Sequence, residues 1–547
     1  MATTPEARPA EPPALQGART MCEALDATFA AADPDAVALR TLGATREYTY
    51  ADTARLIHGI AGALHGLGLR RGHTLALMMV NRPEFHLVDS AAMLLGAAPF
   101  SLYNTSAPEQ LAYILGDAAN DLIVTEERFL DVLRASGATA RLLTVEELLD
   151  QAVDGFDLSP HTSAVEPDDV LTLIYTSGTT GPPKGVQITH ANMLAELRGM
   201  HAAVPMEAGG RAISYLPSAH IADRWGLHYS AFMTYGMTVT GLDDPTRIAE
   251  ALTEVRPTMF GGVPRVWEKL KAALEAKAGD MDLAEAARAN PDIGAAVRQR
   301  LGLDECRFLV VGAAPTPVEV LEFFDALGLP LCEVWGMSET SCVVTTNRPD
   351  ARRNGTVGLP LPGMELRIAE DGELLVRGPL VMKGYRGMPE KTAEAIDADG
   401  WLHTGDVATV DEDGFVSIVD RKKELIINAA GKNMSPANIE ARLKASSPLI
   451  GQAVCIGDRR PYNVALIVPD PDGAAGRDPE DPETVAAVQE AVDEANGHLA
   501  RVEQIKRFAI IPGDWLPGGD ELTPTMKLKR RPIAEKYQAT IDALYER

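Results

Sequence analysis

The chain alternates short apolar runs with helix-like stretches over most of its length, and this alternation restricts its fold more than any other feature. Residues 73–80 (HTLALMMV) have the composition of a buried strand, and residues 83–97 (PEFHLVDSAAMLLGA) form a helix-like stretch directly after it. Residues 121–127 and 141–145 are further strand-like runs. This order favours an α/β architecture with mainly parallel sheets. Since 547 residues exceed what one hydrophobic core holds, two or more domains are expected.

The pattern changes in the last third of the chain. Two hairpins are predicted there, turning at residues 371–372 and 413–414. A strand-like run, a glycine-containing turn and a helix capped by Ser435 come next. We therefore predict a large N-terminal unit of residues 1–422 and a small α+β unit of residues 423–547.

The composition argues against some partners and locations. Basic residues number 51 and acidic residues 77, a net charge of −26 that repels nucleic acid phosphates. The five cysteines form no CxxC pair, which is typical of reduced thiols in a cytoplasmic protein. Residues 1–20 lack the apolar core of a secretion signal and are predicted to form a loose tail. No apolar run reaches the ~18 residues of a membrane span, so membrane contact is left open only as peripheral association.

A loop rich in glycine and hydroxyl side chains follows a buried strand at residues 171–175. Its sequence, TSGTTGPPKG, occupies residues 176–185. Small residues allow backbone N–H groups to converge on phosphate oxygens, and the lysine adds a mobile positive charge. The loop is not a Walker A motif, because Gly185 follows Lys184 where that motif needs Ser or Thr. The candidate phosphate-binding residues are Thr176, Ser177, Gly178, Thr179, Thr180, Gly181 and Lys184.

This loop resembles the phosphate loop of the adenylate-forming superfamily, which includes acyl-CoA synthetases, adenylation domains of peptide synthetases and beetle luciferases. Those enzymes activate a carboxylate with ATP, release pyrophosphate and hold an acyl-AMP. The resemblance implies ATP, Mg²⁺ and coenzyme A as ligands. It also implies the acyl-CoA synthetase-like fold, in which a large N-terminal domain of several subdomains carries a small mobile C-terminal domain.

Two further segments resemble the nucleotide site of this superfamily. The turn at residues 312–315 would lie against the adenine. The element EVWGMSET at residues 333–340 resembles an aromatic-Gly-x-Ser/Thr-Glu motif, with Trp335 in the place usually held by Tyr. A Trp face can still stack on adenine. Ser338 would contact the α-phosphate, and Glu339 and Thr176 would bind Mg²⁺, a cation that prefers oxygen ligands. The nucleotide-binding residues implied here are Gly312, Ala313, Ala314, Pro315, Glu333, Val334, Trp335, Gly336, Met337 and Ser338.

The segment DGWLHTGDVATVDEDGFVSIVDRKK at residues 399–423 resembles the one that distinguishes fatty acyl-CoA synthetases within the superfamily. Asp406 would accept hydrogen bonds from both ribose hydroxyls, since a carboxylate can accept two donors at once. Ile418 would pack on the nucleotide, and Arg421 would reach the ribose or a phosphate.

The segment LTPTMKLKR at residues 522–530 is similar to the loop that carries the adenylation lysine. Met526 precedes Lys527 where many members have Gly, as in the long-chain and bubblegum-like branch. Lys527 would stabilise charge as the carboxylate meets the α-phosphate, with Lys184 and Glu339 as the other catalytic residues. Lys529 is the rival for this role.

The small unit would swing between two poses, because thiol attack needs the space that the lysine occupies during adenylation. The resemblance implies a hinge at Lys423. It also implies a coenzyme A contact at Gly431, Lys432 and Asn433, which a structural turn explains equally well.

The acyl pocket is expected near residues 216–225 (LPSAHIADRW), which resemble the pocket segment of the family. His220 would border the carboxylate and Trp225 would gate the acyl tunnel, although burial in a core helix explains either side chain as well. Val263 and Pro264 belong to GVPRVW, which resembles long-chain and bubblegum-like synthetases.

The motifs together predict an AMP-forming ligase that activates a medium- to long-chain fatty acid as acyl-AMP and transfers the acyl group to coenzyme A. Two alternatives stay open. One is an acyl-AMP ligase that delivers the acyl group to a carrier protein or an amine. The other is a catalytically silent acyl-nucleotide-binding protein, against which the intact Lys184, Glu339, Asp406 and Lys527 argue.

Overall fold

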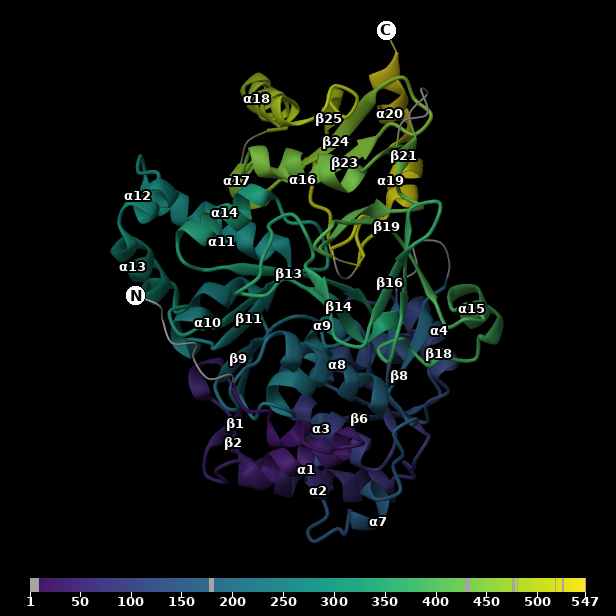
Figure 1. The fold of residues 1–547 in the computed structure, drawn as a ribbon. Helices are drawn as coiled ribbons and strands as arrows, with labels where there is room; N and C mark the ends of the chain where they lie inside the picture. Colours follow the sequence, from purple (N-terminus) through teal and green to yellow (C-terminus); the bar gives the residue numbers. More distant parts are fainter. Residues whose placement is uncertain are drawn as a thin grey trace.

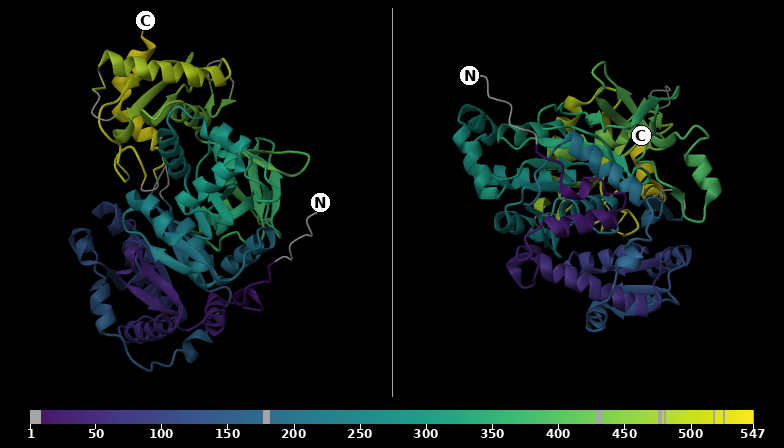
Figure 2. Two further views of the ribbon diagram at one scale, coloured as in Figure 1. Left: turned by 90° about the vertical axis from the view of Figure 1, so that its left-hand side faces the viewer. Right: turned by 60° about the horizontal axis from the view of Figure 1, so that its bottom comes forward.

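A computed structural model describes residues 9–176, 182–427, 433–474, 478–479, 481–516, 518–523 and 526–546. A larger body built from the N-terminal three quarters of the chain carries a smaller body built from its C-terminal part (Figure 1). Figure 2 shows the same division from two further directions. Within the described residues, no helix combines the length and the apolar character needed to cross a bilayer.

The first sheet is wholly parallel, with strand order β4-β3-β5-β6. Its strands are β3 (Thr74–Met78), β4 (Ala98–Ser101), β5 (Leu122–Thr125) and β6 (Arg141–Thr144). The helices that follow or cover them are α2 (Tyr50–Gly66), α3 (Pro83–Leu94) and α4 (Pro108–Ala118). Every residue of β3 and α3 is buried, which explains why β3 is apolar without alternation. The predicted strands and helix of this region are confirmed.

Two more sheets contain both parallel and antiparallel strand pairs and complete the α/β part. One has the order β2-β1-β10-β9 and consists of β1 (Val37–Thr41), β2 (Glu47–Thr49), β9 (Arg211–Ser214) and β10 (Thr238–Gly241). The other has the order β11-β12-β13-β14-β15 and consists of β11 (Met259–Gly262), β12 (Phe308–Val311), β13 (Leu331–Met337), β14 (Cys342–Thr346) and β15 (Leu359–Pro360). Helices α11 (Pro264–Ala278) and α14 (Val318–Ala326) pack beside the second of these sheets. The α/β class predicted from the sequence is therefore the observed one.

Both predicted hairpins are present in an antiparallel sheet of order β16-β17-β19-β20. Its strands are β16 (Glu365–Ile368), β17 (Glu373–Arg377), β19 (Leu402–Val410) and β20 (Val416–Arg421). Residues 371–372 and 413–414 lie in the two turns, as expected for Asp-Gly pairs. The register of the second hairpin sets Asp406 directly opposite Arg421.

The C-terminal body contains a three-stranded sheet with helices on both faces. The strands are β23 (Ile450–Ile456), β24 (Asn463–Pro469) and β25 (Ile505–Ile510), preceded by the short pair β21 (Ile426–Ile427) and β22 (Asn433–Met434). The helices are α16 (Pro436–Ser446), α17 (Pro471–Ala474), α18 (Pro482–His498), α19 (Arg530–Lys536) and α20 (Gln538–Tyr545). Ser435 caps α16 as predicted, because its Oγ accepts a hydrogen bond of 3.1 Å from the Asn438 backbone N–H.

The predicted tail is shorter than residues 1–20, and this prediction is wrong for its second half. Ala14 and Leu15 are buried in the main core. Arg198 donates hydrogen bonds to the carbonyl oxygens of Leu15 (3.0 Å) and Ala18 (2.6 Å). The Pro- and Ala-rich composition predicted disorder, but the burial of two apolar side chains and the hydrogen bonds from Arg198 hold these residues against the large body.

A buried ion pair stabilises the middle of the large body. Asp89 of α3 and Arg224 both have side chains with no exposed area, and Arg224 Nη1 donates to Asp89 Oδ2 at 2.9 Å. His228 Nε2 lies 2.9 Å from the other oxygen of Asp89. Arg224 begins the π-helix η4 (Arg224–Phe232), which overlaps the end of the segment predicted to form the acyl pocket. This pair therefore anchors the pocket segment to α3.

We expect Asp89→Asn to lower the free energy of unfolding by about 3–5 kcal/mol, because it leaves Arg224 buried without a compensating charge. Urea unfolding followed by circular dichroism measures the loss. Asp131→Asn, in an exposed pair with Arg134, is the control and should change stability by no more than about 0.5 kcal/mol. Equal stability of the two variants would contradict a structural role for the pair.

Candidate active site

The predicted phosphate loop joins two antiparallel strands, β7 (Val170–Thr176) and β8 (Lys184–Thr189). The strand pairing sets Thr176 directly opposite Lys184, so the two ends of the loop meet. Ser177, Gly178, Thr179, Thr180 and Gly181 lie outside the described residues. Burial lowers the pKa of Lys184, and the negative charge of Glu339 opposes this shift.

Lys184 and Glu339 share a neighbour that sequence reasoning missed. Tyr385 comes from β18 (Gly384–Tyr385), which pairs with β8. Lys184 Nζ lies 4.0 Å from the centroid of the Tyr385 ring, and the Tyr385 hydroxyl donates a 2.8 Å hydrogen bond to Glu339 Oε1. Burial raises the pKa of Tyr385, so it remains a donor. In the sequence, Tyr385 stands out only as a single aromatic residue beside Gly384.

The surroundings of Glu339 suit a magnesium ion that is shared with a nucleotide. Its carboxylate is buried on the turn η6 (Ser338–Thr340), whereas Thr176 is half-buried at the end of β7. In the described parts of the chain, no three His, Cys, Asp or Glu side chains gather as a complete metal site. Mg²⁺ is commonly held by one or two carboxylates together with phosphate oxygens and water, and one carboxylate fits this pattern.

The turn that carries Ser338 and Glu339 is unusually tight. Ser341 and Cys342 follow it with φ angles of 58° and 112°, and a Cβ on Gly336 would come within 1.6 Å of the Cys342 carbonyl oxygen. Only glycine can occupy position 336, because any side chain would overlap the returning strand. Ser338 is buried, and Met337 is held by a 3.0 Å hydrogen bond from its backbone N–H to Thr340 Oγ1.

Asp406 is the centre of a second group of side chains. Arg421 Nε lies 2.8 Å from Asp406 Oδ1, and the Trp335 indole N–H donates to Asp406 Oδ2 at 3.0 Å. Burial raises the pKa of Asp406, and the positive charge of Arg421 and the hydrogen bond from Trp335 oppose the rise. Ile418 lies half-buried on the same hairpin. Three residues predicted to surround the ribose and adenine are thus in mutual contact.

The turn at residues 312–315 follows β12, and Ala313, Ala314 and Pro315 are exposed. Gly312 lies against Val334, whose Cγ2 atom would be 2.9 Å from a Cβ at that position. The Glu333 carboxylate points elsewhere, since its Oε2 accepts a 3.0 Å hydrogen bond from the Gly355 backbone N–H. Burial raises the pKa of Glu333 to about 7. The side chain of Glu333 is therefore engaged within the protein.

His220 has a defined protonation state. Its Nδ1 accepts a 3.2 Å hydrogen bond from the Ala222 backbone N–H at the start of α9 (Ile221–Asp223). Burial lowers the pKa of His220 to about 4, and the charge of Lys527 lowers it further. The imidazole is neutral at pH 7, and its proton is on Nε2, which can donate to a ligand.

Of the other residues predicted for the acyl pocket, Trp225 and Pro264 are buried and Val263 is half-buried. Trp225 is buried in η4, and its indole N–H donates to the carboxylate of Glu196 on α8 (His190–Ala203). Burial raises the pKa of Glu196 well above its usual range. Val263 is the N-cap of α11, and Pro264 is its buried first residue.

Lys527 reaches this site from the C-terminal body. Its backbone N–H donates to Thr523 Oγ1 at 3.0 Å, and Met526 before it has a left-handed φ of 63°. The residue is exposed, yet nearby protein lowers the pKa of its ammonium by desolvation, and Arg421 adds to this effect. The negative charges of Asp406, Glu424 and Glu339 act in the opposite direction. The ammonium thus lies within electrostatic reach of His220, Asp406 and Glu339 together.

Lys529 points away from this group. Its Nζ donates to the Gly519 carbonyl oxygen at 2.7 Å, within the C-terminal body. Lys423 is exposed and follows Lys422, whose ammonium lies 2.9 Å from Glu373 Oε2 of β17. Gly431 and Lys432 lie outside the described residues, and Asn433 begins β22.

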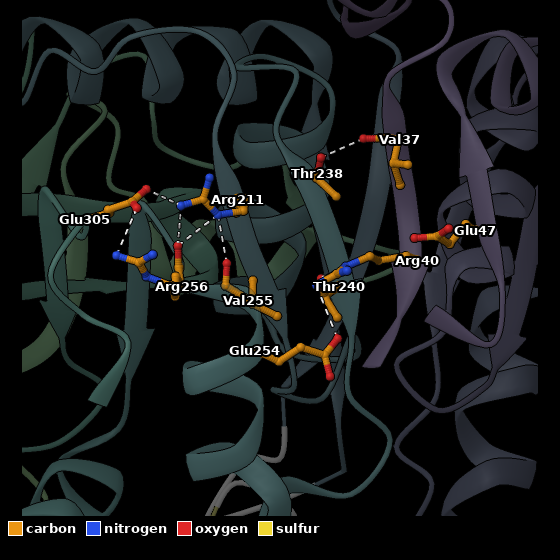
Figure 3. Close-up of a pocket in the computed structure, with 10 residues that line it drawn as sticks. All are labelled: Val37, Arg40, Glu47, Arg211, Thr238, Thr240, Glu254, Val255, Arg256 and Glu305. Carbon is orange, nitrogen blue, oxygen red and sulfur yellow. Dashed lines mark hydrogen bonds and ion pairs between the residues drawn. The ribbon is translucent and has the colours of Figure 1, made fainter. Parts of the chain in front are cut away.

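A separate cavity of about 420 Å³ lies at the sheet formed by β1, β9 and β10 (Figure 3). Its lining includes Arg40, Arg211 and Arg256 but none of the predicted site residues. Each of these arginines pairs with a carboxylate of Glu254 or Glu305. Its arginines are therefore already neutralised, and the cavity is a poor alternative as a nucleotide site.

Two family models match the chain. The AMP-binding enzyme model matches residues 27–386, and the AMP-binding enzyme C-terminal domain model matches residues 423–547. A Mycobacterium tuberculosis protein provisionally named fatty-acid–CoA ligase fadD11 is 49% identical, with coverage of 79% of this chain and 84% of the relative. The long-chain-fatty-acid–CoA ligase FadD15 of Mycobacterium bovis is 36% identical, with coverage of 94% and 95%.

The fold also matches solved structures. O-succinylbenzoate coenzyme A synthetase from Bacillus subtilis, in complex with ATP and a magnesium ion, superimposes with a TM-score of 0.74 at 25% identity. The match covers 93% of this chain and 98% of that one.

We expect Trp335→Phe to raise the KM for ATP about tenfold, because it keeps an aromatic face but removes a donor to a charged group. The same substitution should affect 2′-deoxy-ATP much less, since Asp406 then has one ribose hydroxyl fewer to bind. Steady-state kinetics with the two nucleotides measure the difference. Trp401→Phe is the control, because Trp401 lies in the loop before β19 and its ring is covered by the guanidinium groups of Arg367 and Arg377. An equal rise for both nucleotides would mean that Trp335 only stacks on the base.

Proposed function

Because this chain belongs to the family of AMP-binding enzymes, we propose that it joins a medium- to long-chain fatty acid to coenzyme A through an acyl-adenylate. The chain is an AMP-forming acyl-CoA synthetase that uses ATP, Mg²⁺ and coenzyme A. The observation that supports the residue roles best is that the charge of Lys527 acts on His220, while the charges of Asp406 and Glu339 act on Lys527. It unites motifs that are far apart in the sequence around one reaction centre.

In the first half-reaction, an oxygen of the fatty acid carboxylate attacks the α-phosphorus of ATP. A bond forms between these two atoms, the bond from the α-phosphorus to the pyrophosphate oxygen breaks, and pyrophosphate leaves. Lys184 and the phosphate loop hold the outer phosphates, and Ser338 holds the α-phosphate. Glu339 and Thr176 would hold Mg²⁺, which would supply positive charge to the phosphate oxygens when bound.

Lys527 and His220 act on the carboxylate side of this step. The Lys527 ammonium stabilises the negative charge that gathers as the carboxylate meets the α-phosphate. His220 is neutral, so its Nε2–H orients the carboxylate by a hydrogen bond and adds no second cation beside Lys527. A charged His220 and the Lys527 ammonium would repel one another, and each would then bind less well beside the carboxylate.

Residues of the β19–β20 hairpin, of β13 and of the turn at residues 312–315 hold the nucleoside. Asp406 accepts the ribose hydroxyls, and Trp335 and the turn at residues 312–315 enclose the adenine. Ile418 and Arg421 complete this part of the site. These roles are supported by the contacts among Trp335, Asp406 and Arg421.

In the second half-reaction, the thiol of coenzyme A loses its proton to water, its sulfur forms a bond to the acyl carbon, the bond from the acyl carbon to the phosphate oxygen breaks, and AMP leaves. We propose that residues 423–547 turn at Lys423 between the two steps, which removes Lys527 and admits the pantetheine arm. Gly431, Lys432 and Asn433 would line its path. A cytoplasmic location is proposed as well, because all five cysteines are free thiols.

The products test the function directly. Incubation with ATP, coenzyme A and fatty acids of graded length should release AMP and pyrophosphate in step with a coenzyme A thioester. Chromatography that resolves AMP, ADP and the thioester provides the measurement. Formation of ADP with the thioester would contradict the mechanism, and release of acyl-AMP without thioester would indicate a carrier protein or an amine as acceptor.

Lys527→Ala should separate the half-reactions. Loss of one preorganised charge costs about 10²–10³ in rate, so adenylation should fall by this factor. Thioester formation from synthetic acyl-AMP and coenzyme A should change little, because Lys527 has then left the site. Lys529→Ala is the matched comparison and should leave adenylation within about threefold, since its ammonium binds the Gly519 carbonyl. Equal damage to both steps by Lys527→Ala would assign it a structural or coenzyme A-binding role.

A further inference from the structure

The contact between the small body (residues 426–546) and the rest of the chain is built from polar groups. The N-terminus of α16 rests on Asp420 at the end of β20, whose Oδ2 accepts hydrogen bonds from Ser435 Oγ (2.5 Å) and the Ala437 backbone N–H (3.2 Å). In Figures 1 and 2, α16 and α17 lie beside α14 and α11 of the large body.

Two ion pairs cross this contact. Arg442 of α16 pairs with Glu319 of α14, and both side chains keep partial exposure, at 31% and 47%. Arg265 of α11 pairs with Asp470 next to α17, where the exposures are 28% and 9%. Both pairs join helices of the large body to the small body.

Among the described residues, apolar packing does not hold the two bodies together. Of the apolar clusters formed by described buried residues, those of the large body end at residue 418 and those of the small body begin at residue 426. Interfaces held by polar groups between units of one chain allow relative motion. The relative position of the bodies therefore depends mainly on the charged and hydrogen-bonded contacts described above, together with the close approach of Gly518 to Thr105.

We propose that Arg442–Glu319 and Arg265–Asp470 are positioning pairs that hold the small body in the adenylating pose, with Lys527 at the reaction centre, and that they separate for thioester formation. This inference rests on the proposed function. In the pose described, the charge of Lys527 acts on His220 and Asp406 while both pairs are formed. The pairs thus act through Lys527 and do not touch the substrates.

The strength of such pairs suits an interface that must open in every cycle. A partly exposed ion pair shifts an equilibrium by only about two- to fivefold, and salt weakens it. Two pairs together favour one pose clearly without trapping it. A large apolar contact at the same place would hold the bodies together and slow the second half-reaction.

Charge reversal tests the first pair. Arg442→Glu and Glu319→Arg should each slow adenylation about three- to tenfold, measured by pyrophosphate exchange. Each should leave thioester formation from synthetic acyl-AMP unchanged or make it faster. The double variant restores the attraction with reversed charges, so its adenylation rate should return to within about twofold of the wild-type rate. Raising the salt concentration should slow wild-type adenylation more than that of the single variants.

Glu365→Arg is the control, because Glu365 pairs with Arg377 inside the large body at similar exposure. It should change neither half-reaction. Equal slowing of both half-reactions by the Arg442 and Glu319 variants, or failure of the double variant to recover, would overturn the proposal. Failure of the proposed function would look different, since wild-type protein would then form neither acyl-AMP nor thioester with any acid.

Discussion

The proposed reaction centre depends on an ammonium group that approaches a cluster of charges from another part of the chain. Lys527 lies near Arg421, which repels it, and near Asp406, Glu424 and Glu339, which attract it. Desolvation lowers the pKa of Lys527, and the carboxylates oppose this shift and favour the charged form. The hairpin that carries Asp406, the turn that carries Glu339 and the polar contact between the two bodies all serve this balance.

Local patterns in the sequence were sufficient for much of this arrangement. Strand β3, helix α3 and the hairpins turning at residues 371–372 and 413–414 follow from periodicity and turn chemistry, which act over a few residues. The contact between Asp406 and Arg421 is also local in origin, because the hairpin register sets them opposite each other. When a motif lies within one hairpin, the sequence therefore predicts both which residues form the site and how they face each other.

Contacts between distant segments could not be predicted in this way. Tyr385 touches Lys184 and Glu339 because β18 pairs with β8, and no spacing in the sequence reveals that pairing. Asp89 and Arg224 are likewise joined only by the packing of α3 against η4. The buried carboxyl of Glu196 beside Trp225 had no local signal, since α8 is otherwise an ordinary helix. Such pairs require the three-dimensional fold.

Trp335 stands where the family usually has Tyr. The contact of its side chain with Asp406 explains what this substitution does. An ionised carboxylate offers about four acceptor sites. Arg421 and Trp335 each occupy one on Asp406, which leaves two for the hydroxyls of a ribose. An indole N–H can only donate, whereas a phenol hydroxyl can also accept. Trp at this position therefore supports the ionised form of a carboxylate that burial tends to neutralise, and it does so before the nucleotide arrives.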